Sequence, residues 1–93
     1  MNRDIIWTSK FKRDYKQAMK RNLNVELLDA AIRILASGNT LPESYSDHML
    51  TGNRKGYREC HIQPDWLLVY CIENNDLVLV LTRTGTHSDI FDK

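Results

Sequence analysis

Four residues in the last third of the chain could together transfer protons and hold a phosphate. His61 and Asp65 lie in Tyr57–Trp66, while Arg83 and His87 are separated by only three residues. Histidine suits either proton role because its unperturbed pKa is about 6.5. Arginine stays charged, and its planar donors match phosphate oxygens. Such a set could cleave RNA, with one group deprotonating the 2′-hydroxyl, another protonating the 5′-oxygen, and the cation stabilising phosphate charge.

Further candidates lie around these four residues. His48 occupies a polar loop, and Trp66 or Phe91 could stack on a base. The three histidines lack the paired spacing of a metal motif, so we expect neither a metal nor another cofactor. Structural roles remain open for each candidate: Asp65 could serve the turn after Pro64, Arg83 could pair with a surface carboxylate, and Trp66 could pack in the core.

Helical periodicity precedes this region. We predict a helix that begins at an N-cap in Thr8-Ser9 and ends near Arg21, then a second helix capped by Asn24 and ended by Gly38. The apolar residues at helical spacing predict two stripes that pack in the core. These residues are Phe11, Tyr15, Ala18, Met19, Leu27, Leu28, Ala31, Ile32 and Leu35.

Strand patterns occur at both ends of the chain. Ile5-Ile6-Trp7 suits a first strand, and residues 57–63, 66–72 and 77–83 predict a three-stranded antiparallel meander after an exposed loop at residues 39–56. The N-terminal strand should extend this meander, and both helices should cover one face. The predicted fold class is α+β, with a small antiparallel sheet in a single domain spanning residues 1–93.

Two-residue turns at Pro64-Asp65 and Asn74-Asn75 would set the strand register. The predicted facing pairs are Gln63 with Trp66, His61 with Leu68, Trp66 with Arg83, and Leu68 with Leu81. Side chains alternate along strands, so one predicted face carries His61, Trp66, Leu68, Leu81 and Arg83. The other should lie under the helices and carries Cys60, Ile62, Leu67, Val69, Cys71, Val78 and Val80. A slip of one residue would exchange these faces.

Composition limits the classes of protein. Hydrophobic content of 42% and charged content of 27% suit an ordinary globular protein. The sequence has neither an apolar run of about 20 residues nor a secretory signal, so we expect a cytoplasmic protein. Cys60 and Cys71 should be reduced core thiols. Six basic residues and one acid between positions 8 and 21 could attract a polyanion or form a solvated helix face.

Three segments together resemble the YafQ branch of the RelE toxin superfamily. They are Asp47–Gly52, Lys55–Tyr70 and Arg83–Phe91. The resemblance covers essentially the whole chain, including the order of strand, two helices, loop and meander. It implies a RelE-like fold and the toxin of a type II toxin–antitoxin pair.

The resemblance also implies an activity and partners. It predicts a ribosome-dependent endoribonuclease that cleaves messenger RNA in the A site by metal-independent acid–base catalysis and so inhibits translation. His48, His61, Asp65 and His87 match the proton-transfer set, Arg83 matches the phosphate-binding arginine, and Trp66 and Phe91 match residues that shape the site. The base and the acid are left unassigned. Partners would be a cognate antitoxin and the ribosome with bound message, without membrane association or sequence-specific DNA binding by the toxin alone.

Two alternatives use the same scaffold without catalysis. One is a non-catalytic protein with the RelE fold, such as a DNA gyrase inhibitor. The other is an inert module that only sequesters an antitoxin, which predicts no growth arrest on expression. A gyrase inhibitor has no need of a proton-transfer set, so the histidines and Asp65 favour the nuclease.

Overall fold

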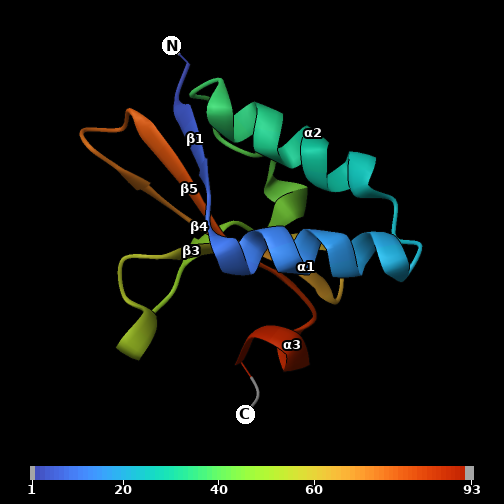
Figure 1. The fold of residues 1–93 in the computed structure, drawn as a ribbon. Coiled ribbons are helices and arrows are strands. Elements are labelled where there is room, and N and C mark those ends of the chain that lie inside the picture. Colours follow the sequence, from blue (N-terminus) through green and yellow to red (C-terminus); the bar gives the residue numbers. More distant parts are fainter. Residues whose placement is uncertain (1, 92–93) are drawn as a thin grey trace.

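The computed structural model describes residues 2–91, which form one sheet with helices on both faces (Figure 1). The five strands have the order β1-β5-β4-β3-β2. Their bounds are β1 Asp4–Trp7, β2 His48–Met49, β3 Arg58–Gln63, β4 Trp66–Glu73 and β5 Val78–Gly85. β1 pairs with β5 in parallel, and the other neighbours are antiparallel. The predicted α+β class and the extension of the meander by the N-terminal strand are confirmed. The prediction of an antiparallel sheet is wrong for β1, which runs parallel to β5 and makes the sheet mixed.

Two helices pack on one face, as predicted. α1 spans Ser9–Lys20 and begins where the Thr8 hydroxyl accepts the Phe11 N–H. α2 spans Val25–Ala36 and is capped by Asn24, while Gly38 follows its end with a φ of 90°. Cap side chains satisfy N–H groups that have no partner inside the helix. The helix boundaries are therefore set locally.

The apolar stripes were predicted correctly except at their edges. Phe11, Leu28 and Leu35 are buried in the main core, but Met19 and Leu27 are 49% and 38% exposed. An amphipathic helix buries only a stripe, and these two side chains lie outside it. No helix formed by residues 2–91 has the length and apolar character needed to cross a membrane.

The predicted strand register is wrong beyond the first turn. Gln63 does face Trp66, but the ladder shifts between His61 and Gln63, so that His61 faces Leu67. The second connection is a four-residue loop in which Asn74, Asn75 and Asp76 have positive φ. The asparagines adopt the left-handed backbone expected of them, but the turn is longer than two residues. The predicted pairs of His61 with Leu68, Trp66 with Arg83, and Leu68 with Leu81 do not form.

A second shift, between Val69 and Tyr70, moves β5 relative to β4. Val69 faces Arg83 and Tyr70 faces Leu81, which leaves Thr82 as the extra residue. A bulge of this kind redirects the side chains that follow it. As a result, Trp66, Leu68 and Leu81 pack with Cys60 and Ile62 against the helices. Leu67 and Val69 lie on the opposite face. Of the residues predicted to lie under the helices, only Cys60 and Ile62 do so. His61 and Arg83 lie on the face opposite to Trp66, Leu68 and Leu81, because they face Leu67 and Val69.

That opposite face is covered by a third helix that the sequence did not predict. α3 spans His87–Phe91 (Figure 1). Its buried Ile90 packs against Leu67 and Val69. The predicted loop 39–56 also contains structure: besides β2, it forms short 3-10 helices at Glu43–Tyr45 and Gly52–Arg54. β2 pairs with β3 and forms one edge of the sheet.

Both cysteines are free and buried, as predicted. Burial raises the pKa of Cys60 to about 12 and that of Cys71 to about 11. Because the thiolate is the reactive form, neither thiol should react quickly in the folded protein. We expect labelling by Ellman's reagent at pH 8 to be ~100-fold or more slower than in denaturant. Rapid labelling of the native protein would contradict the buried placement.

Candidate active site

Asp65 and His87 form a direct pair at one rim of the sheet. Asp65 occupies the turn between β3 and β4, and His87 begins α3. The Nδ1–H of His87 donates to Asp65 Oδ1 at 2.8 Å, and the backbone N–H of His87 donates to the same oxygen at 3.1 Å. These two bonds, the side-chain bond first, lower the pKa of Asp65 below its ordinary value. The pair fixes the imidazole and leaves Nε2 available for a substrate.

His61 lies beside this pair. The shift in β3 places it on the face that carries Leu67, and its Nδ1–H donates to the carbonyl oxygen of Pro64 at 3.1 Å. The rings of His61 and His87 are 5.9 Å apart between centroids. Each ring is held through Nδ1, and neither Nε2 makes a hydrogen bond within residues 2–91. Two imidazoles therefore present free nitrogens at one site.

An aromatic side chain and a cation extend the same surface. The Phe91 ring is 6.3 Å from that of His87, one helical turn away on α3. Arg54, in the loop before β3, holds its Cζ 4.6 Å from the Phe91 centroid. Such a distance fits a cation–π contact. The sequence analysis did not single out Arg54, because nothing in the linear sequence brings it to Phe91.

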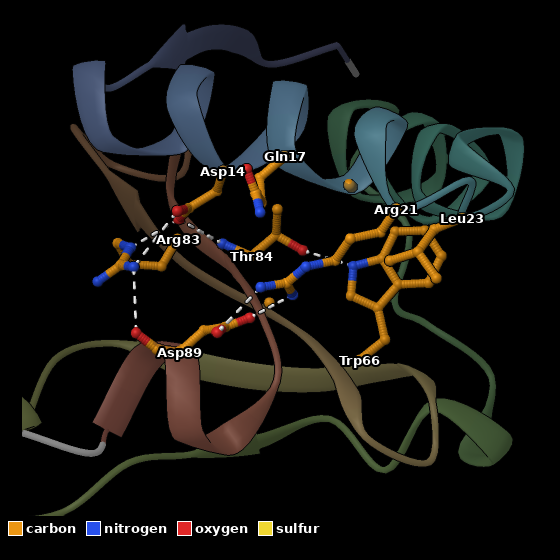
Figure 2. A pocket seen from close by; sticks show the side chains of 10 residues that line it. Asp14, Gln17, Arg21, Leu23, Trp66, Arg83, Thr84 and Asp89 are labelled. Carbon is orange, nitrogen blue, oxygen red and sulfur yellow. Dashed lines mark hydrogen bonds and ion pairs between the residues drawn. The ribbon is translucent and has the colours of Figure 1, made fainter.

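Arg83 lies deeper, on the α1 side of the site. Its Nε donates to Asp14 Oδ2 at 2.6 Å and its Nη2 donates to Asp14 Oδ1 at 3.3 Å. Nη2 also donates to the backbone oxygen of Asp89 at 3.3 Å. The pKa of Arg83 is raised above its ordinary value, chiefly by these hydrogen bonds to Asp14. The guanidinium is thus anchored by an acid that the sequence analysis did not associate with the site (Figure 2).

A second ion pair fixes α3. Arg21 donates to Asp89 Oδ2 at 2.7 Å (Figure 2). The same carboxylate accepts the Thr86 N–H, and the Thr86 hydroxyl accepts the Asp89 N–H, both at 3.0 Å. This reciprocal arrangement is a capping box. A Cβ at Gly85 would lie 2.9 Å from Asp89 Cβ, so glycine permits this close approach. Together these contacts set the direction of the helix that carries His87.

The Asp89 carboxylate should give the fold a measurable acid dependence. Its pKa is lowered to about 2, chiefly by the hydrogen bond from Arg21. The folded state therefore favours the ionised form, so the stabilisation is complete above the usual carboxyl range and is lost as pH falls from about 4 towards 2. We expect Asp89→Asn to lower the unfolding free energy at pH 7 by about 1 kcal/mol, after discounting for partial exposure.

Urea unfolding at pH 7 and pH 3 would measure this effect. The difference between wild type and Asp89→Asn should shrink at the lower pH. Glu43→Gln, at an exposed carboxylate remote from α3, is the matched control and should give similar small differences at both pH values. An Asp89→Asn deficit that stays constant with pH would contradict the assignment.

Trp66 and His48 make their hydrogen bonds and ion pair with groups other than His61 and His87. Trp66 is 3% exposed, and its Nε1–H donates to the Thr84 hydroxyl at 3.0 Å. In this position it supports β5 from below and presents no ring face to a base. His48 lies on β2, with Nε2 3.2 Å from the buried Glu59 carboxylate and Nδ1 2.8 Å from the Ser46 carbonyl oxygen. Glu59 was not singled out from sequence, because an acid in a strand gives no signal of its own.

The structure thus brings together His61, Asp65, His87 and Phe91, with Arg83 adjacent through Asp89. Within residues 2–91, no three histidine, cysteine, aspartate or glutamate side chains are placed to hold a metal ion. Paired imidazoles, one oriented by a carboxylate, are equipped for general acid–base chemistry.

Comparisons with known proteins agree with this fold. Residues 3–92 match the family model described as a bacterial toxin of a type II toxin–antitoxin system, YafQ. The chain is 38% identical over 92 residues to the mRNA interferase toxin YafQ of Escherichia coli K12, covering 98% of each chain. It is also 38% identical over 89 residues to a putative YafQ toxin of Haemophilus influenzae, covering 90% of this chain and 87% of that protein.

Solved structures give the same result. The crystal structure of YafQ from E. coli BL21(DE3) superposes with a TM-score of 0.87 at 40% identity, covering 96% of this chain and 98% of that one. The toxin in the E. coli DinJ–YafQ toxin–antitoxin complex gives a TM-score of 0.89 at 38% identity, covering 98% and 99%. The fold is therefore that of toxins from type II toxin–antitoxin systems. Within that class, the chain belongs to the YafQ family.

Proposed function

We propose that this protein is an endoribonuclease that cleaves messenger RNA in the ribosomal A site and thereby inhibits translation. The observation that carries the proposal is the pair of imidazoles, His61 and His87, with ring centroids 5.9 Å apart and His87 bound to Asp65. Similarity to relatives named mRNA interferase toxins supports messenger RNA as the substrate.

The proposed reaction needs two proton transfers across one phosphate. One imidazole removes the proton of the 2′-hydroxyl, whose oxygen attacks the adjacent phosphorus. The other imidazole protonates the departing 5′-oxygen as the bond from phosphorus to that oxygen breaks. The products are a 2′,3′-cyclic phosphate or the 3′-phosphate formed from it, and a 5′-hydroxyl. Either histidine fits either role, and Asp65 orients His87.

Arg83 would stabilise the negative charge that develops on the phosphate. Phe91, at the end of α3, could stack on a base of the RNA. A preorganised cation aimed at developing charge is among the larger contributions to such catalysis. The two hydrogen bonds from Arg83 to Asp14 keep the guanidinium in one place before substrate arrives. His48 is engaged with Glu59 and Ser46, so the proposal places it outside the proton-transfer pair, and Trp66 would shape the site from the core.

Partners follow from the same proposal. A cognate antitoxin would hold the protein inactive, as supported by likeness to the toxin of the DinJ–YafQ complex. The other partner is the translating ribosome with its message, which places the protein in the cytoplasm. The proposal involves no metal, no membrane and no sequence-specific DNA binding by the toxin alone.

Programmed ribosomes provide the direct test. Purified protein would be added to ribosomes carrying a defined message, and cuts would be mapped by primer extension, with naked message as the control. Cuts confined to A-site codons of the ribosome-bound message are expected. Cleavage of the message in the absence of ribosomes would refute ribosome dependence. Absence of any cut together with growth arrest in cells would favour a non-catalytic gyrase inhibitor.

A further inference from the structure

A cationic cavity lies beside α3, with Ile90 of that helix in its lining. Its volume is about 210 Å³, and three of the residues that line it are Lys10, Arg54 and Arg83. None of its lining residues is acidic. A group of cations that lines an open cavity without a matching acid is suited to bind an anion.

The cations come from three separate elements. Lys10 lies in the first turn of α1, Arg54 in the loop before β3, and Arg83 in β5. Neither Lys10 nor Arg54 forms an ion pair within residues 2–91. Arg83 is neutralised from its other side by Asp14, through Nε and Nη2. The cavity therefore keeps an excess of two positive charges.

The bulge in β5 forms part of the wall of the same cavity. Thr82 is the extra residue of the bulge, and both Thr82 and Arg83 line the cavity. The buried Thr82 hydroxyl oxygen has no hydrogen-bond partner among the residues that the structure describes.

The cavity adjoins the candidate active site through Arg54 and Phe91. Arg54 stacks on Phe91, whose ring lies 6.3 Å from that of His87. Ile90, which also lines the cavity, follows His87 by three residues on α3. A strand whose scissile phosphate lies between the histidines would thus reach the cavity with a neighbouring nucleotide.

We propose that this cavity binds a phosphodiester next to the scissile one, with Lys10 and Arg54 as its ligands. This assignment rests on the proposed function and extends it to a second contact with the RNA strand. The ligand is one phosphate group of a nucleic acid, for which lysine supplies a point charge and arginine a planar fork. An acidic protein segment is the competing occupant. The stacking of Arg54 on Phe91 beside His87 favours the nucleic acid, because it joins the cavity to the site of cleavage.

Neutral phosphate analogues can test the contact one position at a time. Synthetic messages would carry a single methylphosphonate at successive positions flanking the cut, and cleavage would be measured on programmed ribosomes. For wild type, we expect one flanking position to raise the half-saturating protein concentration about five- to tenfold, as for loss of a charge-assisted hydrogen bond. The cleavage rate at saturation should change by less than about twofold, because the contact positions the strand without touching the reacting atoms.

The Lys10→Gln, Arg54→Gln double variant completes the comparison. On unmodified message, this variant should show a similar rise in the half-saturating protein concentration. Placing the methylphosphonate at the sensitive position should then raise that concentration little further. Arg33→Gln, which removes an exposed charge on α2, is the matched control and should behave as wild type. If the effects of the double variant and of the methylphosphonate on the half-saturating concentration simply added at every position, the site would be overturned while the nuclease activity stayed intact. Wild-type cleavage by the double variant with weakened antitoxin binding would assign the cavity to an acidic segment instead. Absence of cleavage by wild type would overturn the proposed function and this site together.

Discussion

Replacing His87 with alanine should lower the rate of messenger cleavage on programmed ribosomes by about 10²- to 10⁴-fold, the usual contribution of a positioned acid or base. His87 is held by Asp65 through Nδ1, so Nε2 would meet the substrate. The side chain is exposed, with 54% of its surface accessible, and the backbone N–H of residue 87 would keep its bond to Asp65. We therefore expect the fold to survive the substitution.

Single-turnover cleavage, followed by primer extension, would measure this loss, and thermal unfolding would verify the fold. Ser88→Ala is a suitable control because it changes the next residue of the same helix outside the site. Asp65→Asn should give a smaller loss with an altered pH profile, since an amide can still accept the Nδ1–H but carries no charge. Cleavage by His87→Ala at the rate of wild type would remove His87 from the catalytic set.

Arg83→Ala should reduce cleavage by about 10²- to 10³-fold, as expected when one group that stabilises transition-state charge is lost. Unlike His87→Ala, it should also destabilise the fold. The Asp14 side chain is only 16% exposed and would lose two hydrogen bonds from the guanidinium, keeping the one from the Thr84 N–H. A partly buried carboxylate without its cation costs about 1–3 kcal/mol. Chemical denaturation would measure this cost.

A double variant separates the two effects of Arg83. Adding Asp14→Asn to Arg83→Ala removes the unpaired charge, so most of the stability should return while cleavage stays low. Recovery of cleavage together with stability would mean that Arg83 acts only through the fold. Asp14→Asn alone should leave Arg83 present but less firmly held. The half-saturating concentration and the saturated cleavage rate of this variant would separate an effect on RNA binding from an effect on the chemical step.

Local signals were enough to predict α1 and α2. Thr8, Asn24 and Gly38 mark ends that depend on hydrogen bonds within a few residues, and such bonds are encoded nearby. The turn at Pro64 was equally local, and its facing pair, Gln63 with Trp66, was predicted correctly. The α+β class followed from the order of these elements.

The faces of the sheet could not be predicted in the same way. Two shifts in the strand ladders and a four-residue loop change which face of the sheet each residue lies on. Residue types alone do not reveal where these shifts occur. Because alternation along a strand has a period of two, one extra residue at Thr82 moves every following side chain to the other face. The shift turns the buried Thr84 side chain toward the main core, where its hydroxyl accepts the Nε1–H of Trp66.

By itself, the sequence determined the candidate residues: His61, Asp65 and His87 were singled out from residue types that can transfer protons, before any contact between them was known. Tertiary structure decided which of them meet. The Asp65–His87 pair joins a turn to a helix 22 residues away, and Arg83 is anchored by Asp14 from 69 residues away. Arg54 reaches Phe91 only because its loop folds over α3. Contacts between distant segments depend on the packing of the whole chain, which no local pattern of residues specifies.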